Sequence, residues 1–292
     1  MLETPTNLFL ESKDLDFPFC LAWANETWSK RWDGQNHHIL QKQTHEPKEE
    51  KWLQHFEYLI KAWTDKRAIK IDNKPVFIIY RPHYIKNIGQ MLEFWTLKAK
   101  EYGLDGLYFI AMKQYPFPEP AEYLHHFDAV VHFQPFEAIF SLNNEIGFFT
   151  KNLHSAFNTV LPSSLKKLLS SQLFHFKKIY SQPKHYDYEA IWEKILINSN
   201  EDHDMTTYSG AFIDWDNTAR YKNRSTVFDN VKPARFEYWL TKLANIVKEK
   251  HQEPLIFINA WNEWAEGTYL EPDEKYKYEY LEAVSNAIKN SS

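Results

Sequence analysis

Residues 255–267 read LIFINAWNEWAEG, in which a short apolar run is followed by two carboxylates, two indoles and two asparagine amides. The run 255–258 is typical of a buried β-strand. Glu263 and Glu266 lie three residues apart just beyond it. A pair of solvated acids in a turn is the commoner explanation of that spacing, but it leaves the two neighbouring tryptophans without a purpose. Acids, amides and indoles together are what a site for breaking or making a glycosidic bond needs.

The composition is that of a water-soluble globular protein with an unusual stock of aromatic residues. The 292 residues are 43% hydrophobic and 25% charged, and the net charge of −5 argues against a nucleic-acid partner. The chain has 11 Trp, 17 Tyr and 21 Phe, which can build a large core and can also stack on sugar rings. Neither GxGxxG nor GxxxxGK[ST] occurs among its few glycines, so we expect no phosphate loop and no cofactor.

Cysteine and histidine usage predicts neither disulfides nor a metal site. Cys20 is the only cysteine, so no disulfide can form within the chain, which fits a reducing compartment. No Cys/His cluster has metal-ligand spacing. The first residues lack the pattern of a signal peptide, and no window approaches 18 uninterrupted apolar residues. We therefore expect a cytoplasmic protein without a metal.

Apolar runs alternate with helical patterns along the chain. Buried strands are predicted over 17–23, 75–80, 106–112, 129–133, 208–213 and 255–259. Helices are predicted over 48–66, 88–102, 233–250 and 276–290. The strand segments are almost continuously apolar, as expected for parallel strands covered on both faces. This order predicts an α/β protein with a parallel sheet.

Polar and aromatic residues gather just after each predicted strand. In barrels and open sheets of α/β proteins, function lies at the carboxyl ends of the strands. The candidate binding residues at these ends are Asn25, Glu26, Trp28, Arg81, Gln134, Trp215, Asp216, Asn217, Arg220, Trp261 and Asn262. Two alternatives stay open: a strand-end Asn or Asp can simply cap the next helix, and Arg81 can form a structural ion pair instead of gripping a carboxylate or phosphate.

The segment 137–205 is too long for a plain connection between a strand and a helix, so we interpret it as an insertion. Within it, 161–180 mixes lysines with Leu, Phe and Ile in an amphipathic pattern. A helix packed on the domain with a solvated basic face is the favoured interpretation. The alternative is peripheral contact with an anionic membrane surface.

Five ordered motifs resemble one known family. Residues 19–34 (FCLAWANETWSKRWDG) are similar to its FC-x-x-WANExW-x-x-x-WDG signature. Further matches are KPVFIIYRP at 74–82, FDA and FQP within 127–135, WDNTAR at 215–220, and NAWNEWAEG with LEP within 259–272. The chain is thereby identified as a member of the WbsX-like, glycoside hydrolase family 99-like domains associated with polysaccharide synthesis.

The resemblance implies a single domain over 1–292 with the (β/α)8 TIM-barrel fold, related to endo-α-mannosidases. We predict six strands, and the family pattern begins with two more, so the barrel is expected to be incomplete, lacking its first two βα units. An unclosed barrel leaves two edge strands and an exposed interior. We therefore expect the chain alone to self-associate or to be poorly soluble.

The spacing of the two acids also suggests a mechanism. Residues at i and i+3 of a helical turn lie roughly 5–6 Å apart, and a gap of about 5 Å is typical of retaining glycosidases. Two close carboxylates repel, which raises the pKa of one of them. The resemblance implies that Glu263 deprotonates the substrate 2-hydroxyl and that Glu266 protonates the leaving oxygen.

Three functions remain in competition. The first is a retaining glycoside hydrolase acting on a bacterial cell-surface polysaccharide or its precursor. The second is a glycosyltransferase of O-antigen or capsule biosynthesis that uses the same acids on a sugar acceptor. The third is an inactive, truncated barrel that only binds glycans.

Overall fold

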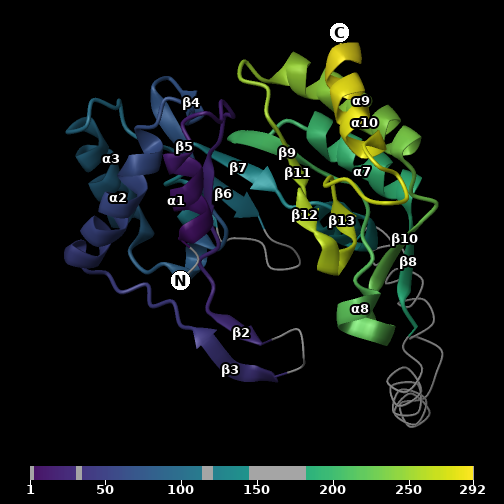
Figure 1. Ribbon diagram of the computed structural model, residues 1–292, viewed down its shortest axis with the longest axis horizontal. Helices are drawn as coiled ribbons and strands as arrows, with labels where there is room; N and C mark the ends of the chain where they lie inside the picture. Colours follow the sequence, from purple (N-terminus) through teal and green to yellow (C-terminus); the bar gives the residue numbers. More distant parts are fainter. Residues whose placement is uncertain (1–2, 31–34, 114–120, 145–181, 292) are drawn as a thin grey trace, which may run out of the picture. The chain divides into compact units, whose positions relative to one another are not determined.

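A computed structural model describes residues 3–30, 35–113, 121–144 and 182–291 of the chain (Figure 1). These residues divide into two compact units. The first unit comprises Met1–His132 and His203–Thr207, and the second comprises Phe133–Asp202 and Tyr208–Ser292. The helix predicted over 161–180, with its hypothetical membrane contact, lies outside the described residues.

The first unit is built on parallel strands. They follow the order β1 (Leu21–Trp23), β5 (Lys74–Ile79), β6 (Tyr108–Lys113) and β7 (Ala129–His132). The other elements are α1 (Thr4–Glu11), β2 (Trp28–Lys30), β3 (Gln35–Gln41), α2 (Glu49–Trp63), β4 (Lys70–Ile71), η2 (Pro82–Tyr84), α3 (Ile88–Lys100) and α4 (Ala121–Leu124). Strands β2 and β3 form a separate antiparallel hairpin, and β4 pairs with β5 in the antiparallel sense.

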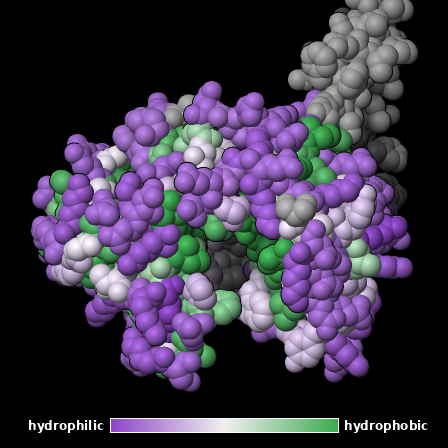
Figure 2. All heavy atoms as spheres, turned by 90° about the horizontal axis from the view of Figure 1, so that it is seen from above, coloured by the Kyte–Doolittle hydropathy of each residue, from purple (hydrophilic) through white to green (hydrophobic). Residues whose placement is uncertain are grey.

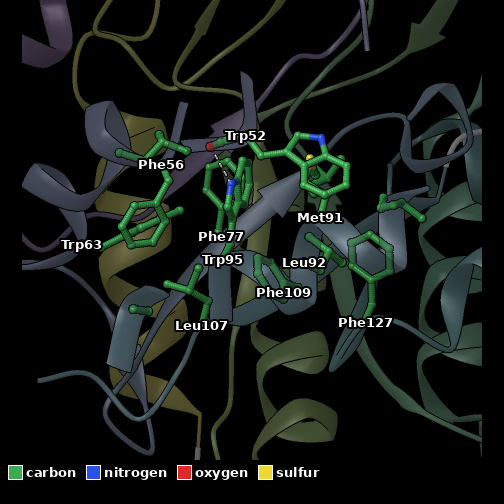
Figure 3. Packing of buried hydrophobic residues seen from close by; sticks show 14 of the residues in the cluster. Trp52, Phe56, Trp63, Phe77, Met91, Leu92, Trp95, Leu107, Phe109 and Phe127 are labelled. Carbon is green, nitrogen blue, oxygen red and sulfur yellow. Dashed lines mark hydrogen bonds between the residues drawn. The ribbon is translucent and has the colours of Figure 1, made fainter. Parts of the chain in front are cut away.

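The core of the first unit joins α2 and α3 to the sheet (Figure 3). Trp52, Phe56 and Trp63 of α2 are all buried, because their spacing places them on one side of the helix. Trp95 of α3 is completely buried and donates its indole N–H to the backbone oxygen of Trp52 at 2.9 Å. Its ring meets Phe77 of β5 edge-on at 5.9 Å. This bond joins α2 to α3 inside the core.

The second unit contains a parallel pair of strands with helices packed on it. Strand β9 (Thr206–Phe212), which belongs to this unit from Tyr208, pairs with β11 (Ile256–Asn259). The other elements are β8 (Lys184–Asp187), α7 (Tyr188–Asn200), α8 (Thr218–Tyr221), η3 (Lys222–Arg224), β10 (Thr226–Asp229), α9 (Pro233–Lys250), β12 (Asn262–Glu263), η4 (Trp264–Glu266), β13 (Thr268–Tyr269) and α10 (Glu279–Asn290). Strands β8 and β10 pair in parallel, whereas β12 and β13 form a short antiparallel hairpin.

Helices α7, α9 and α10 bury their apolar faces in a second core. Trp192 of α7 stacks on Phe212 of β9 with ring centroids 5.6 Å apart, and Phe236 of α9 meets Tyr280 of α10 at 5.9 Å. Helices α9 and α10 lie side by side (Figure 1). The N–H-free Pro233 begins α9, where the first helical N–H groups have no partner within the helix.

The α/β class and the mainly parallel strand pairing are confirmed. Each of the six predicted strands and each of the four predicted helices overlaps an observed element. The expected helical turn over Glu263–Glu266 is instead the end of β12 running into the 3₁₀ turn η4. The hairpin of β12 and β13 was not predicted, because strands of two residues carry no apolar run.

No helix among the described residues is both long and apolar enough to cross a membrane. The face of the molecule seen in Figure 2 is largely hydrophilic.

A partly buried histidine packed against the first core makes the stability of the protein depend on pH. His55 of α2 packs edge-on against the rings of Trp23 and Trp95, with ring centroids 4.5 Å and 5.1 Å away. Burial, and then the charge of His45, lower the pKa of His55 to about 4. An unfolded histidine titrates near 6.5. As the pH falls below 6.5, His55 therefore becomes protonated in the unfolded chain while it stays neutral in the folded chain.

We predict that the free energy of unfolding in urea decreases between pH 6.5 and about 4, with His55 contributing at most about 3 kcal/mol of the decrease. His55→Gln should remove that part of the decrease, since glutamine does not titrate. His38→Gln, which changes an exposed histidine of β3, is the control and should keep the wild-type dependence. An identical pH dependence in His55→Gln and wild type would refute the assignment.

Candidate active site

The two predicted acids lie on a compact hairpin after β11. The hydroxyl of Thr268 donates to the backbone oxygen of Asn259 at 2.6 Å, and the amide of Leu270 donates to the backbone oxygen of Ala260 at 3.0 Å. These bonds fold the chain back on the end of β11. Glu263 therefore ends β12, and Glu266 lies in the turn η4 at the tip of the hairpin.

Gly267 lets this turn pack directly on the segment that follows β9. Its φ of +69° is the left-handed conformation that favours glycine. A Cβ atom on Gly267 would lie 2.9 Å from the backbone nitrogen of Asp216, which is too close. With no side chain there, the amide of Asp216 donates to the backbone oxygen of Glu266 at 2.9 Å. The ends of β9 and β11 are thereby tied together beside the acids.

One guanidinium contacts both acids. Arg220 of α8 donates from Nη1 to Glu266 Oε1 at 2.7 Å, and its Nη2 lies 3.5 Å from Glu263 Oε1. The side chain of Glu266 is 16% exposed, whereas that of Glu263 is 42% exposed. The pair is therefore asymmetric: one carboxylate is sheltered and firmly paired, and the other is open to solvent and loosely paired.

The surroundings raise the pKa of Glu266 above its ordinary value. Burial is the largest cause, and the negative charge of Glu263 acts in the same direction. The positive charge and hydrogen bond of Arg220 oppose both. Glu266 is thus the acid better suited to hold a proton, and Arg220 limits how strongly it does so.

Three predicted residues after β9 build the segment that presents Arg220. Asn217 is buried, and its Oδ1 accepts the amide of Thr226 at 2.8 Å. Asp216 Oδ1 accepts the amide of Thr218 at 2.9 Å, at the start of α8. Trp215 is only 1% exposed and packs edge-on against a phenylalanine ring, so it cannot stack on a sugar as predicted. Asn217 directly precedes α8, but its side chain bonds to the first residue of β10 and does not cap the helix. Neither the capping alternative nor the predicted contact with a sugar describes this residue.

Gln134 also differs from its predicted binding role. Its side chain is buried and donates from Nε2 to Glu137 Oε2 at 2.8 Å. Its backbone oxygen accepts the Nδ2 of Asn259 at 2.9 Å, next to the end of β11. Gln134 therefore has a structural role: it is buried and its backbone binds the last residue of β11.

Exposed residues of the hairpin remain available for binding. Trp261 and the side chain of Asn262 are exposed, although the backbone of Asn262 pairs with Tyr269. Trp264 is also exposed and was not among the predicted binding residues, although it lies between the two acids in the sequence.

Asp214 is a second residue that the candidate set left out. Burial raises its pKa to about 6, against the opposing hydrogen bond from the amide of Trp215. Its position directly after a predicted strand was the signal that could have identified it.

The first unit gathers its own group of predicted residues at the ends of β1 and β5. Asn25 is completely buried; its Nδ2 donates to the backbone oxygen of Arg81 at 2.8 Å, and its Oδ1 accepts the Arg81 amide at 2.7 Å. This clamp joins the two strand ends and uses both polar ends of the side chain, which does not fit the predicted contact with a sugar. Arg81 Nε lies 2.9 Å from Glu26 Oε1, so the structural ion pair is present.

A cavity of about 480 Å³ lies beside this clamp. It is lined by Asn25, Glu26, Thr27, Gln43, His45, Glu46, Pro47, Tyr84 and Lys86. Trp28, in β2, is exposed. The candidate residues thus form two groups, one in each unit. Within the described residues, no three or more His, Cys, Asp or Glu side chains are grouped so that they could hold a metal ion.

Comparison with curated proteins gives distant relatives. Two proteins from strains of Xanthomonas campestris pv. campestris, both described as "Uncharacterized protein WxcX", are 25% identical to this chain over 99% of its length. The match covers 37% of each relative, so the chain spans little more than a third of their length.

Among solved structures, a "Glycoside hydrolase-like protein" matches with a TM-score of 0.51 and 14% identity. The match covers 83% of this chain and 62% of that one, and at this identity it speaks for the fold alone. The family model described as "Glycosyltransferase WbsX" matches residues 1–284. The chain therefore belongs to the WbsX glycosyltransferase family.

Proposed function

We propose that this chain forms the catalytic part of a carbohydrate-active enzyme that acts on glycosidic bonds of a bacterial cell-surface polysaccharide or its precursor. The observation that carries the proposal is the pair Glu263 and Glu266 on one turn, unequally buried and both in contact with Arg220. Two carboxylates in different environments are the recurring machinery of retaining glycosidic chemistry.

Each acid has a distinct role in the proposed reaction. Glu263, the more exposed carboxylate, removes the proton of the sugar 2-hydroxyl as that oxygen attacks the anomeric carbon. Glu266, the sheltered acid with a raised pKa, gives its proton to the departing glycosidic oxygen. The product of this step is a 1,2-anhydro sugar bound beside a deprotonated Glu266 and a protonated Glu263.

The second step restores both acids. Glu266 takes a proton from the incoming hydroxyl group as its oxygen attacks the anomeric carbon. The three-membered ring opens, and the 2-oxygen recovers its proton from Glu263. The same two acids can activate either of two attacking groups. If water attacks, the enzyme is a hydrolase; if a sugar hydroxyl attacks, it is a transferase.

The family description favours the transferase, and the glycoside hydrolase-like neighbour provides only a fold for comparison. Product analysis with and without added sugar acceptors separates the two reactions. For the fold we propose an incomplete (β/α)8 barrel, supported by the strand–helix alternation and by the similarity to that neighbour.

We predict that Glu263→Gln and Glu266→Gln each lower kcat about 10²–10⁴-fold, the usual contribution of an acid or base group. The assay uses the cell-surface polysaccharide of the producing organism and a panel of 4-nitrophenyl glycosides. Glu266→Gln should lose less activity on the nitrophenyl substrates, because nitrophenolate leaves without a proton. Glu253→Gln changes an exposed acid before β11 and is the control. Full activity in both active-site variants would end this assignment.

Arg220 gives a second prediction, on pH dependence. Because Arg220 lowers the pKa of Glu266, Arg220→Met should raise that pKa further. A general acid must be protonated, so activity falls as the pH rises through its pKa. The alkaline limb of kcat/KM should therefore move to higher pH in Arg220→Met.

Arg220→Lys is the matched control, since it keeps the positive charge and should move the alkaline limb less than Arg220→Met does. If the limb lies at the same pH in wild type and Arg220→Met, Arg220 does not control the protonation of Glu266.

A further inference from the structure

Trp264 is an exposed indole whose orientation is fixed by two contacts. It is 49% exposed, yet its ring stacks on Tyr269 with centroids 3.7 Å apart and planes 15° apart. Its Nε1 donates to Glu271 Oε2 at 2.7 Å. The Tyr269 hydroxyl in turn donates to Asp273 Oδ2 at 2.9 Å, so the backing ring is fixed as well.

An arrangement of this kind needs an explanation. Ordering exposed side chains costs conformational entropy, and an indole half open to water recovers little hydrophobic free energy in return. Tyr269 covers one face of the indole, and about half of the Trp264 residue stays open to solvent. A rigid aromatic surface that is ordered before any ligand arrives lowers the entropic cost of binding one.

A cavity of about 530 Å³ borders this aromatic pair. It is lined by Trp264, Tyr269, Pro272, Asp273, Glu274 and Lys275. Its volume falls within the roughly 300–1,000 Å³ of small-molecule sites. Glu274 and Lys275 are exposed and offer a hydrogen-bond acceptor and hydrogen-bond donors beside the apolar rings. Two acids against one lysine disfavour an anionic ligand.

We propose that Trp264 is the stacking platform of a glycan subsite, which binds the C–H face of a neutral pyranose while Glu274 and Lys275 contact its hydroxyls. A pyranose has an apolar C–H face bordered by hydroxyl groups. That surface is complementary to a flat aromatic ring with polar side chains beside it.

The proposal deepens the proposed function and rests on it for the nature of the substrate. Trp264 and Glu266 belong to the same turn, η4, so the bound ring is a neighbour of the reacting sugar. The substrate class that follows is a chain of at least two sugars, of which the one at this subsite is neutral.

The test measures binding by saturation-transfer difference NMR with the full chain. The probes are methyl α- and β-pyranosides of glucose, mannose, galactose, N-acetylglucosamine, rhamnose and fucose. At least one should bind the wild type, with the strongest saturation on the C–H protons of one ring face. Trp264→Ala should weaken its binding at least 10-fold. Trp264→Phe keeps a flat ring without the N–H and should weaken it less.

Tyr238→Ala, which removes an exposed ring from α9, is the control and should bind as the wild type does. The double variant Glu263→Gln/Glu266→Gln should also keep binding, so a failure of the proposed catalysis leaves this measurement readable. The subsite is refuted if no pyranoside in the panel binds the wild type, or if Trp264→Ala and Trp264→Phe bind as tightly as the wild type.

Discussion

The candidate active site depends on one backbone hydrogen bond, from the amide of Asp216 to the carbonyl of Glu266. It exists because Gly267 has no side chain and adopts a positive φ that brings η4 against the segment after β9. That contact shelters Glu266 and places it within reach of Arg220. Without it, two acids on a hairpin would be ordinary solvated carboxylates. The candidate site therefore forms only where the segment after β9 and the hairpin after β11 are in contact.

Around this contact, buried polar residues build the scaffold and exposed ones are left for ligands. Asn217 and Gln134 hold strand ends in the second unit, and Asn25 does the same in the first. The side-chain amide of each residue forms its hydrogen bonds within the protein, as expected for a buried polar group. Glu263, Trp261 and Trp264 keep their side chains partly or largely open to solvent. The same strand ends thus supply both rigidity and chemistry.

The sequence was sufficient for the main elements, since a buried strand such as β5 or a one-sided helix such as α2 carries its own apolar pattern. It also located the acid pair. It could not distinguish structural residues from ligand-binding residues at the strand ends. An asparagine that hydrogen-bonds to the backbone and one that binds a sugar look the same in a sequence. Tryptophans show the same limit: Trp215 was predicted to bind ligand and is buried, whereas Trp264 was not predicted to bind and is exposed. The pairing of Arg220 with both acids depends on a fold across some forty residues, which no local spacing encodes.

Amide hydrogen exchange at Asp216 tests this account most directly. Gly267→Ala and Gly103→Ala both place alanine at a positive φ, but only at position 267 would the new Cβ meet neighbouring backbone. The account predicts that the Asp216 amide is protected in wild type and in Gly103→Ala and exchanges rapidly in Gly267→Ala. Equal protection in the two variants, or rapid exchange in the wild type, would contradict the claim that this one contact assembles the site.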